Sequence, residues 1–385
     1  MRTRSRATAF TLAFIAILSA AGLLRADTGF NHQILQTRPI QLGTSGGNIN
    51  DRSTSFCCSG TLGALVTKSG VQYILSNNHV LARTNAGTVG DAIIQPGLID
   101  QTPVCAQDTA DTIATLSQWA KISFKRGTTN IVDAAIAQVQ AGRVTTDGSI
   151  LDIGIVSAAP ASAAINTPVM KSGRTTGLTS GMVAAVNVTI SVKYGSACGG
   201  GRGTATFKNQ IRVTPGSFSD GGDSGSLIVT TATPAQPVGL LFAGSSTDTF
   251  ANPIQDVLNL FGVTMVGATT TAGGGWMKRW FGRLLPGVAV AQAASPLHPV
   301  TPASQEAASR AKEGHEQALL AIPGVVGVGV GASETVAGEA VVEVYVEKAT
   351  ADVRSSIPSR VDNVPVKIVE TGEVRARTGF CRPRT

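Results

Sequence analysis

The segment best suited to chemistry in this chain runs from Ser219 to Leu227 and reads SDGGDSGSL. A serine hydroxyl becomes a nucleophile only when a base takes its proton, and the oxyanion that follows needs donors already aimed at it. Glycines beside Ser224 let the backbone turn so that the amides of Gly222 and Ser224 point at one oxygen. An ordinary Gly/Asp/Ser turn is the alternative, but an apolar strand follows directly at 227–229. We therefore predict a nucleophile at Ser224 and an oxyanion hole at Gly222 and Ser224.

A base for this serine must come from very few histidines. Only His32 and His79 lie between residues 27 and 270. His79 comes just after the apolar run 71–75, where a rigid element can hold a side chain that stays accessible. His32 lies in a polar stretch without comparable support. A lone histidine often has no role, so His79 is predicted as general base only in combination with Ser224.

The third group is Asp133, which lies inside the apolar run 131–137. Burying a carboxylate without a partner is costly. The partner we expect is the Nδ1–H of His79, which Asp133 would hold in the useful tautomer. The alternative is an Asp133 that bonds loop amides or is exposed at the start of a strand. Asp108 and Asp111, in a polar stretch, are weaker candidates for the same role.

Taken together, these segments resemble the trypsin-like serine peptidases of the chymotrypsin fold. The resemblance covers about residues 50–265 and rests on 58–62, 78–80, 132–135, 222–225 and 239–244, in the family's His, Asp, Ser order. Segments 75–79, 171–177 and 251–254 are most similar to the bacterial and plant narrow-leaf type branch. The resemblance implies two packed six-stranded β-barrels, with His79 and Asp133 from the first and Ser224 from the second. It also implies hydrolysis of peptide bonds through an acyl-enzyme, with no cofactor and no metal.

The chain departs from the family pattern at three places. Val80 stands where many members have a cysteine, so their usual bridge to Cys58 is missing. Phe218, six residues before the nucleophile, is not acidic, so a preference for Arg or Lys is not indicated. No Ile-Val-Gly-Gly activation segment is present, so Asp223 lacks the new N-terminus that it binds in many zymogens. The substrate pocket that the resemblance implies is lined by Phe218, Phe242, Ala243 and Gly244.

Other glycine-rich or histidine-containing segments do not indicate a ligand site. The run 324–331 lacks G-x-G-x-x-G spacing and predicts a Gly/Val strand, and 198–203 lacks the Gly-Lys-Ser/Thr ending of a phosphate loop. His298 and His315 are too isolated to be metal ligands.

The elements that must position the three residues are predicted to be β-strands. Short apolar runs occur at 61–67, 71–76, 131–139, 183–192, 225–231 and 237–243, separated by turn residues. Such spacing is typical of an all-β domain. In the run 253–261, the residues Ile254, Val257, Leu258 and Phe261 share one face, which predicts a short helix that closes this domain.

Acid usage divides the chain into two modules. Every acidic residue between 27 and 270 is Asp, whereas nine of the eleven after residue 300 are Glu. We expect a peptidase domain at 27–267, a linker rich in Thr, Gly, Ala and Pro at 268–302, and a C-terminal α+β domain at 303–385. Within the last, helices at 305–321 and 351–361 and strands at 325–330, 340–347 and 364–370 predict a small sandwich, with regulation or substrate docking as its proposed role. The basic, aromatic segment 276–285 could contact a membrane surface, and a bland linker patch is the alternative.

Composition and the first residues indicate an exported globular protein. The 385 residues are 43% hydrophobic and 14% charged, which supports sizeable cores. Residues 1–26 place Arg2, Arg4 and Arg6 before an apolar run, the layout of a signal peptide. We expect a periplasmic or secreted protein, anchored in the membrane if this segment is retained. Residues 1–26 contain four arginines and no acidic residue, so the rest of the chain has a net charge of +3 rather than +7. This small excess does not indicate a nucleic-acid partner.

Five cysteines are expected to form disulfides in an exported protein. Cys57 and Cys58 are adjacent, so we hypothesise that one joins Cys105 and the other Cys198. The odd number leaves one cysteine unpaired or paired between chains. The sequence thus predicts an exported serine endopeptidase acting on protein or peptide substrates, of undetermined oligomeric state. A catalytically idle trypsin-fold binding or sensing module is the alternative.

Overall fold

The computed structural model describes residues 31–195, 200–269, 299–379 and 382–383. The expected signal peptide at 1–26, the possible membrane contact at 276–285 and the cysteines at 198 and 381 lie outside these residues. None of the helices in the described part of the chain is long and apolar enough to cross a membrane.

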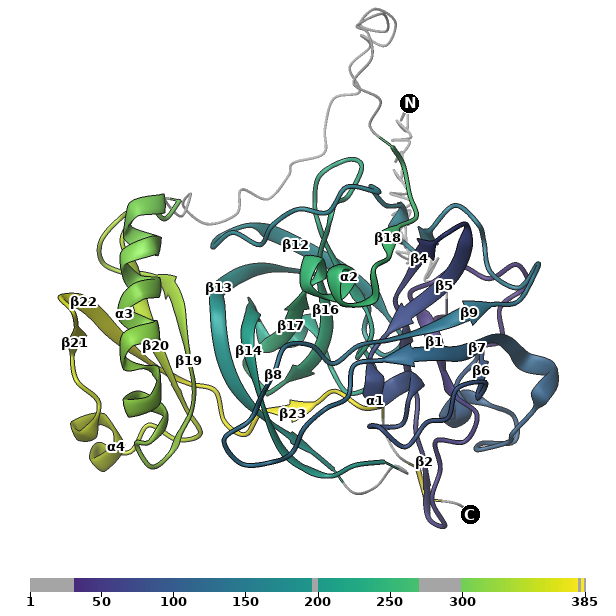
Figure 1. Cartoon of the computed structure of the whole chain (residues 1–385), viewed down its shortest axis with the longest axis horizontal. Coiled ribbons are helices and arrows are strands. Elements are labelled where there is room, and N and C mark those ends of the chain that lie inside the picture. Colours follow the sequence, from purple (N-terminus) through teal and green to yellow (C-terminus); the bar gives the residue numbers. More distant parts are fainter. Residues whose placement is uncertain (1–30, 196–199, 270–298, 380–381, 384–385) are drawn as a thin grey trace, which may run out of the picture.

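The first curled sheet is built from the N-terminal half of the chain together with one short strand at 264–265, and it closes on itself (Figure 1). Only Gly63 separates β3 from β4, so these two act as one bent strand, and pairing of β1 with β3 completes a six-stranded barrel. The sheet order is β18 (Thr264–Met265), β4 (Ala64–Lys68), β5 (Val71–Ser76), β9 (Ala135–Val139), β7 (Thr112–Trp119), β6 (Ala92–Ile94), β1 (Thr44–Asn48) and β3 (Gly60–Leu62).

The second barrel is closed by the pairing of its two longest strands, β13 and β14. Its order is β13 (Gly177–Tyr194), β12 (Pro168–Gly173), β15 (Leu227–Thr230), β16 (Pro237–Gly244), β17 (Thr249–Pro253) and β14 (Gly203–Thr214), with β8 (Thr129–Asn130) added to β14. Helix α2 (Ile254–Phe261) follows, and Ile254, Val257, Leu258 and Phe261 are buried in a hydrophobic cluster that the first barrel shares with β15 and β16. The expected double barrel and its closing helix are confirmed.

The C-terminal residues fold in the expected order of helix, strand, strand, helix and strand. They form α3 (Pro302–Leu320), β19 (Val325–Ala332), β20 (Ala340–Val346), α4 (Ala351–Ser356), β21 (Arg360–Val361) and β22 (Val364–Glu370). Helix α3 packs its buried Ala311 and Leu319 against valines of β19 and β20. The fold class expected from sequence, a double barrel followed by a small α+β domain, is therefore confirmed. Helix α4 ends earlier than expected, at Ser356, just ahead of Pro358.

This α+β unit is joined to the second barrel by main-chain hydrogen bonding. Strand β19 pairs antiparallel with β13, so the sheet of the barrel continues through β19, β20 and β22. Buried Arg212 of β14 binds Glu343 of β20 and Asp248 of the barrel, at 2.8 and 2.6 Å. Beyond β22 the chain returns to the barrels as β23 (Arg375–Ala376) and β24 (Arg382–Pro383), which Figure 1 shows crossing toward the first barrel.

The remaining elements are short. They are α1 (Asn78–Leu81), β2 (Phe56–Cys57), the hairpin β10 (Ser149–Ile150) and β11 (Gly154–Ile155), and single 3₁₀ turns at Leu98–Asp100, Thr109–Asp111 and Gly216–Phe218.

Candidate active site

His79 is held by a single helical turn at the end of a buried strand. Strand β5 ends at Ser76, and α1 begins two residues later. The side chain of Asn77 donates to the Asp133 carbonyl at 2.7 Å, and that of Asn78 donates to the Ala120 carbonyl at 2.6 Å. Both asparagines are fully buried, so these bonds fix the turn and with it the direction of the imidazole.

His79 and Asp133 are bonded in the closed interior of the structure. The distance from His79 Nδ1 to Asp133 Oδ2 is 2.5 Å, and the His79 backbone N–H donates to Oδ1 at 3.2 Å. An ionised carboxylate only accepts, so Nδ1 carries the proton and Nε2 is the acceptor of the neutral ring. His79 Nε2 is buried and has no hydrogen-bond partner among the described residues. The ring is therefore arranged to receive a proton at Nε2.

A third donor to Asp133 is Tyr194, which the sequence analysis did not identify. Its hydroxyl donates to Asp133 Oδ2 at 2.7 Å, and its ring packs edge-on to His79 with centroids 6.0 Å apart. Burial, together with the Asp133 carboxylate, raises the pKa of Tyr194 well above its usual value, so the hydroxyl stays protonated and donates. Tyr194 lies at the end of a strand far along the chain, and no local pattern marks it.

Ser224 lies in the tight loop that precedes β15, fully buried. Its carbonyl accepts from the Thr61 amide at 2.8 Å, and a β-carbon on Gly63 would lie 1.9 Å from the Gly225 carbonyl oxygen. The loop thus packs closely on the bent strand β3–β4 of the first barrel. The next strand in the chain, β5, is followed by the helical turn that contains His79. The Ser224 hydroxyl donates to the Phe242 carbonyl at 3.2 Å and makes no hydrogen bond to His79 in this structure.

The loop that holds Ser224 is anchored through Asp223. The fully buried carboxylate accepts from the amides of Thr175, Thr176 and Asp220 at 2.8, 3.2 and 2.9 Å, and from the Thr176 hydroxyl at 2.7 Å. Lys171 Nζ lies 3.7 Å from Asp223 Oδ2. The sequence contains no activation segment whose new N-terminus would pair with Asp223. In the structure, the segment 171–176 supplies a cation and hydrogen-bond donors to this carboxylate.

Lys171 is itself fully buried and contributes the charge that faces Asp223. Its Nζ also donates to the Thr176 hydroxyl and to the Gly177 carbonyl. Burial lowers the pKa of Lys171 to about 8, and the neighbouring Asp223 carboxylate opposes that shift. The charge of this lysine is therefore sensitive to mildly alkaline pH.

Gly222 has a backbone conformation that only glycine adopts readily. Its φ is +103°, and a β-carbon there would lie 2.3 Å from the Thr175 hydroxyl oxygen. The Gly222 N–H donates to the carbonyl oxygen of Arg377 at 2.8 Å. The amide of one expected oxyanion donor thus already binds a peptide carbonyl.

The residues expected at the substrate pocket lie in different places. Gly244 lines a hollow together with Asp220, Gly221 and Ser245. The rings of Phe218 and Phe242 are fully buried in the core of the second barrel, as is Ala243. Phe218 packs inward because an aromatic side chain gains more from the apolar core than from a polar hollow.

The cysteines agree in part with the expected bridges. Cys57 and Cys105 form a disulfide, which confirms that one of the adjacent pair joins Cys105. Cys58 is also disulfide-bonded, and the two remaining cysteines lie outside the described residues. Val80, which replaces the usual cysteine, packs on Gly60, where a β-carbon would lie 2.5 Å from its methyl group.

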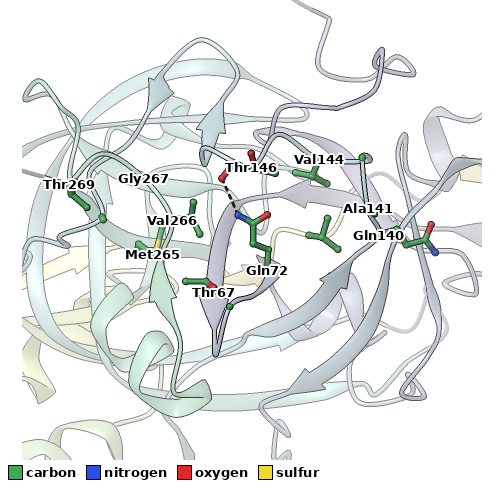
Figure 2. Close-up of a pocket in the computed structure, with 14 residues that line it drawn as sticks. Thr67, Gln72, Gln140, Ala141, Val144, Thr146, Met265, Val266, Gly267 and Thr269 are labelled. Carbon is green, nitrogen blue, oxygen red and sulfur yellow. Dashed lines mark hydrogen bonds between the residues drawn. The ribbon is translucent and has the colours of Figure 1, made fainter.

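Other candidate positions carry no catalytic arrangement. His32 bonds the Gly43 carbonyl and Asp152, both at 2.8 Å, and so ties the N-terminal segment to the first barrel. Figure 2 shows a second hollow, between the β4–β18 pair and the turn 140–146, which has no titratable side chain in its lining. Within the described residues, no three His, Cys, Asp or Glu side chains gather as a metal site would require.

Comparison with known proteins gives structural matches alone. No protein-family model and no curated protein matches the chain. A glutamic acid-specific serine protease is similar in structure, with 21% identity, a TM-score of 0.40, and coverage of 59% of this chain and 100% of its own. Chymotrypsin from Cellulomonas bogoriensis has 19% identity, a TM-score of 0.38, and coverage of 60% and 99%. Thermobifida fusca protease A has 17% identity, a TM-score of 0.37, and coverage of 58% and 98%.

All three matches are bacterial serine proteases, and each match spans nearly the whole of the other protein. At these identities and TM-scores they carry no argument about activity, which has to come from the residues of this chain. The narrow-leaf type branch stays a prediction.

Proposed function

We propose that this chain is an exported serine endopeptidase with Ser224 as nucleophile, His79 as general base and Asp133 as the group that orients the histidine. The observation that carries the proposal is the buried bond from His79 Nδ1 to Asp133, which leaves Nε2 without a partner. A buried acceptor with no partner is costly in a folded protein. A buried nitrogen without a partner is expected where that nitrogen must take up a proton. Gly60 lies between Val80 and Ser224, since a β-carbon there would lie 2.5 Å from Val80 and 2.9 Å from the Ser224 carbonyl oxygen, so the Ser224 loop is close to the residue that follows His79.

The reaction follows from these groups. Rotation about the Cα–Cβ bond of Ser224 would turn its hydroxyl from the Phe242 carbonyl toward His79 Nε2. As the serine oxygen attacks a peptide carbonyl, its proton passes to Nε2 of His79. The Asp133 carboxylate stabilises the imidazolium that forms, and the Tyr194 hydroxyl stabilises that carboxylate. The amides of Gly222 and Ser224 bind the oxyanion, and His79 then returns the proton to the leaving amine.

Export fits the chemistry of the cysteines. Disulfides persist in oxidising compartments and are rare in the cytosol, and the Cys57–Cys105 bridge is formed. Together with the layout of residues 1–26, this bridge supports a periplasmic or secreted protein.

Labelling with a fluorescent fluorophosphonate tests the proposal, because the reagent bonds only to a serine activated by its base. We expect wild-type protein to label and Ser224→Ala to lose all label. Ser157→Ala is the matched control, since Ser157 is also buried and its hydroxyl, within the described residues, accepts only from the nearby Ala159 amide. A folded wild type that takes no label at any stage of processing would instead favour the idle binding or sensing module.

A further inference from the structure

The segment that follows β22 runs from the second barrel to the first, with hydrogen bonds to both. Strand β23 pairs antiparallel with β16, with Ala376 opposite Ala243 and Arg375 opposite Gly244. The Val374 carbonyl accepts from the Lys193 amide at 2.9 Å. Figure 1 shows this yellow stretch leaving the α+β unit and crossing to the side of α1, the helix that bears His79. Addition of an extended strand to a sheet edge is a common way of binding a peptide.

Main-chain bonds hold the peptide on both sides of the Arg377–Thr378 bond. The Arg377 amide donates to the Phe242 carbonyl at 3.0 Å, and the Gly222 amide donates to the Arg377 carbonyl at 2.8 Å. Beyond the bond, the Gly379 amide donates to the Ser59 carbonyl at 2.8 Å. The first two partners belong to the second barrel and the third to the first barrel.

Ser224 lies next to this peptide bond. Its hydroxyl and the Arg377 amide share one acceptor, the Phe242 carbonyl, at 3.2 and 3.0 Å. The Arg377 carbonyl already occupies a proposed oxyanion donor, Gly222. An extended chain fixed on both sides, with its carbonyl at that donor, is oriented for attack on the carbonyl carbon.

The Arg377 side chain lies against Asp220, Gly244 and Ser245, and lines the same hollow as these residues. Its Nη1 lies 3.2 Å from Asp220 Oδ1, and its Nη2 donates to the Ser245 carbonyl. A β-carbon on Gly244 would lie 2.4 Å from Arg377 Nε, so this position has to stay glycine for the guanidinium to enter. Because Phe218 is not acidic, the sequence did not indicate a preference for a basic side chain before the cleaved bond. In the structure, the carboxylate that meets the arginine belongs to Asp220, four residues before the nucleophile.

We propose that Arg377–Thr378 is a self-cleavage site, at which the chain is its own first substrate and Asp220 selects arginine. This inference rests on the proposed function. Ser224 Oγ forms an ester with the Arg377 carbonyl carbon while its proton passes to His79. The bond to the Thr378 nitrogen breaks as that nitrogen takes the proton. Water then hydrolyses the ester, which leaves a carboxylate on Arg377 and frees residues 378–385.

The intact mass of purified full-length protein, followed over time at pH 7.5, tests this proposal. Samples are reduced first, because Cys58 is disulfide-bonded and Cys381 lies in the released segment. Wild type should lose the eight residues 378–385, with a rate constant independent of protein concentration. Ser224→Ala should stay intact.

Two further variants test the role of the pocket. Arg377→Glu places a carboxylate beside Asp220 and should slow cleavage at this bond more than tenfold. Asp220→Asn keeps the acceptor oxygen that binds the Gly221 amide but removes the charge. Because Asp220 is 57% exposed, its pairing with arginine is partly screened, and we expect cleavage to slow by about three- to fivefold.

The outcomes separate this inference from the proposed function. Wild type that labels with fluorophosphonate but keeps the 377–378 bond intact overturns self-cleavage and leaves the peptidase assignment standing. Loss of 378–385 from Ser224→Ala as well would assign the cut to another protease and also overturn it. A folded wild type that neither labels nor cuts removes the proposed function, and the inference with it.

Discussion

Replacement of Gly222 by alanine tests the proposed oxyanion donor most directly. At φ +103° a side chain is strained, and the new β-carbon would lie 2.3 Å from the Thr175 hydroxyl oxygen and 2.9 Å from Arg174 Nη1. Both neighbours are held, because Arg174 binds Asp100 through two nitrogens and the Thr175 hydroxyl donates to the Gly221 carbonyl. The backbone at residue 222 therefore has to move, and its N–H turns away from the carbonyl that it binds.

The expected magnitudes separate strain from catalysis. A left-handed backbone costs a residue with a β-carbon about 1–2 kcal/mol in stability. Loss of one oxyanion donor lowers kcat by about 10²–10³-fold. Gly127→Ala is the matched control, because Gly127 has φ +79° and open space where the β-carbon would lie. Both variants should lose stability to urea, but only Gly222→Ala should lose activity to that extent.

The assay is steady-state hydrolysis of a chromogenic ester that the wild type cleaves, at a temperature where circular dichroism shows each variant folded. Fluorophosphonate labelling rates give a second readout of the same donor. If folded Gly222→Ala keeps kcat within about threefold of wild type, the Gly222 amide is not an oxyanion donor, and the argument from its bond to Arg377 is refuted.

Three other predictions concern the surroundings of the site. Tyr194→Phe removes a donor to the buried Asp133 carboxylate and should lower the free energy of unfolding by about 1.5–3 kcal/mol; an unchanged urea midpoint would contradict this. Cys105→Ser opens a disulfide between residues 48 apart in sequence and should cost about 4 kcal/mol, provided that the oxidised wild type is the reference. Burial lowers the pKa of Lys171 to about 8, from the usual lysine value of 10.5. Between about pH 8 and pH 10.5 the folded chain therefore binds fewer protons than the unfolded chain. Stability from this group alone thus rises with pH across that window, by up to about 3 kcal/mol. Urea titrations at pH 7.5, 9 and 10 should show the free energy of unfolding rising more with pH in wild type than in Lys171→Met. The same pH dependence in both proteins would refute this.

The elements of the fold could be predicted from sequence because their signals are local. Alternating apolar runs repeat within a few residues, and the helix at 254–261 shows its buried face in four residues. The same holds for the order of helices and strands after residue 300. A bridge from one of the adjacent cysteines to Cys105 was also expected, and the structure shows that the partner is Cys57.

The sequence by itself determined the residue types of the candidate site and the two-barrel scaffold that carries them. Only the tertiary structure decided that Tyr194 bonds Asp133, that Lys171 faces Asp223, and that Asp220 rather than Phe218 meets an arginine. It also brought Arg377 to Gly222, across more than 150 residues of chain. The physical reason is that these contacts depend on how the two barrels and the returning C-terminal strand pack in space. Helix and strand periodicity relates residues only a few positions apart, so it cannot reveal contacts between residues that are distant in sequence.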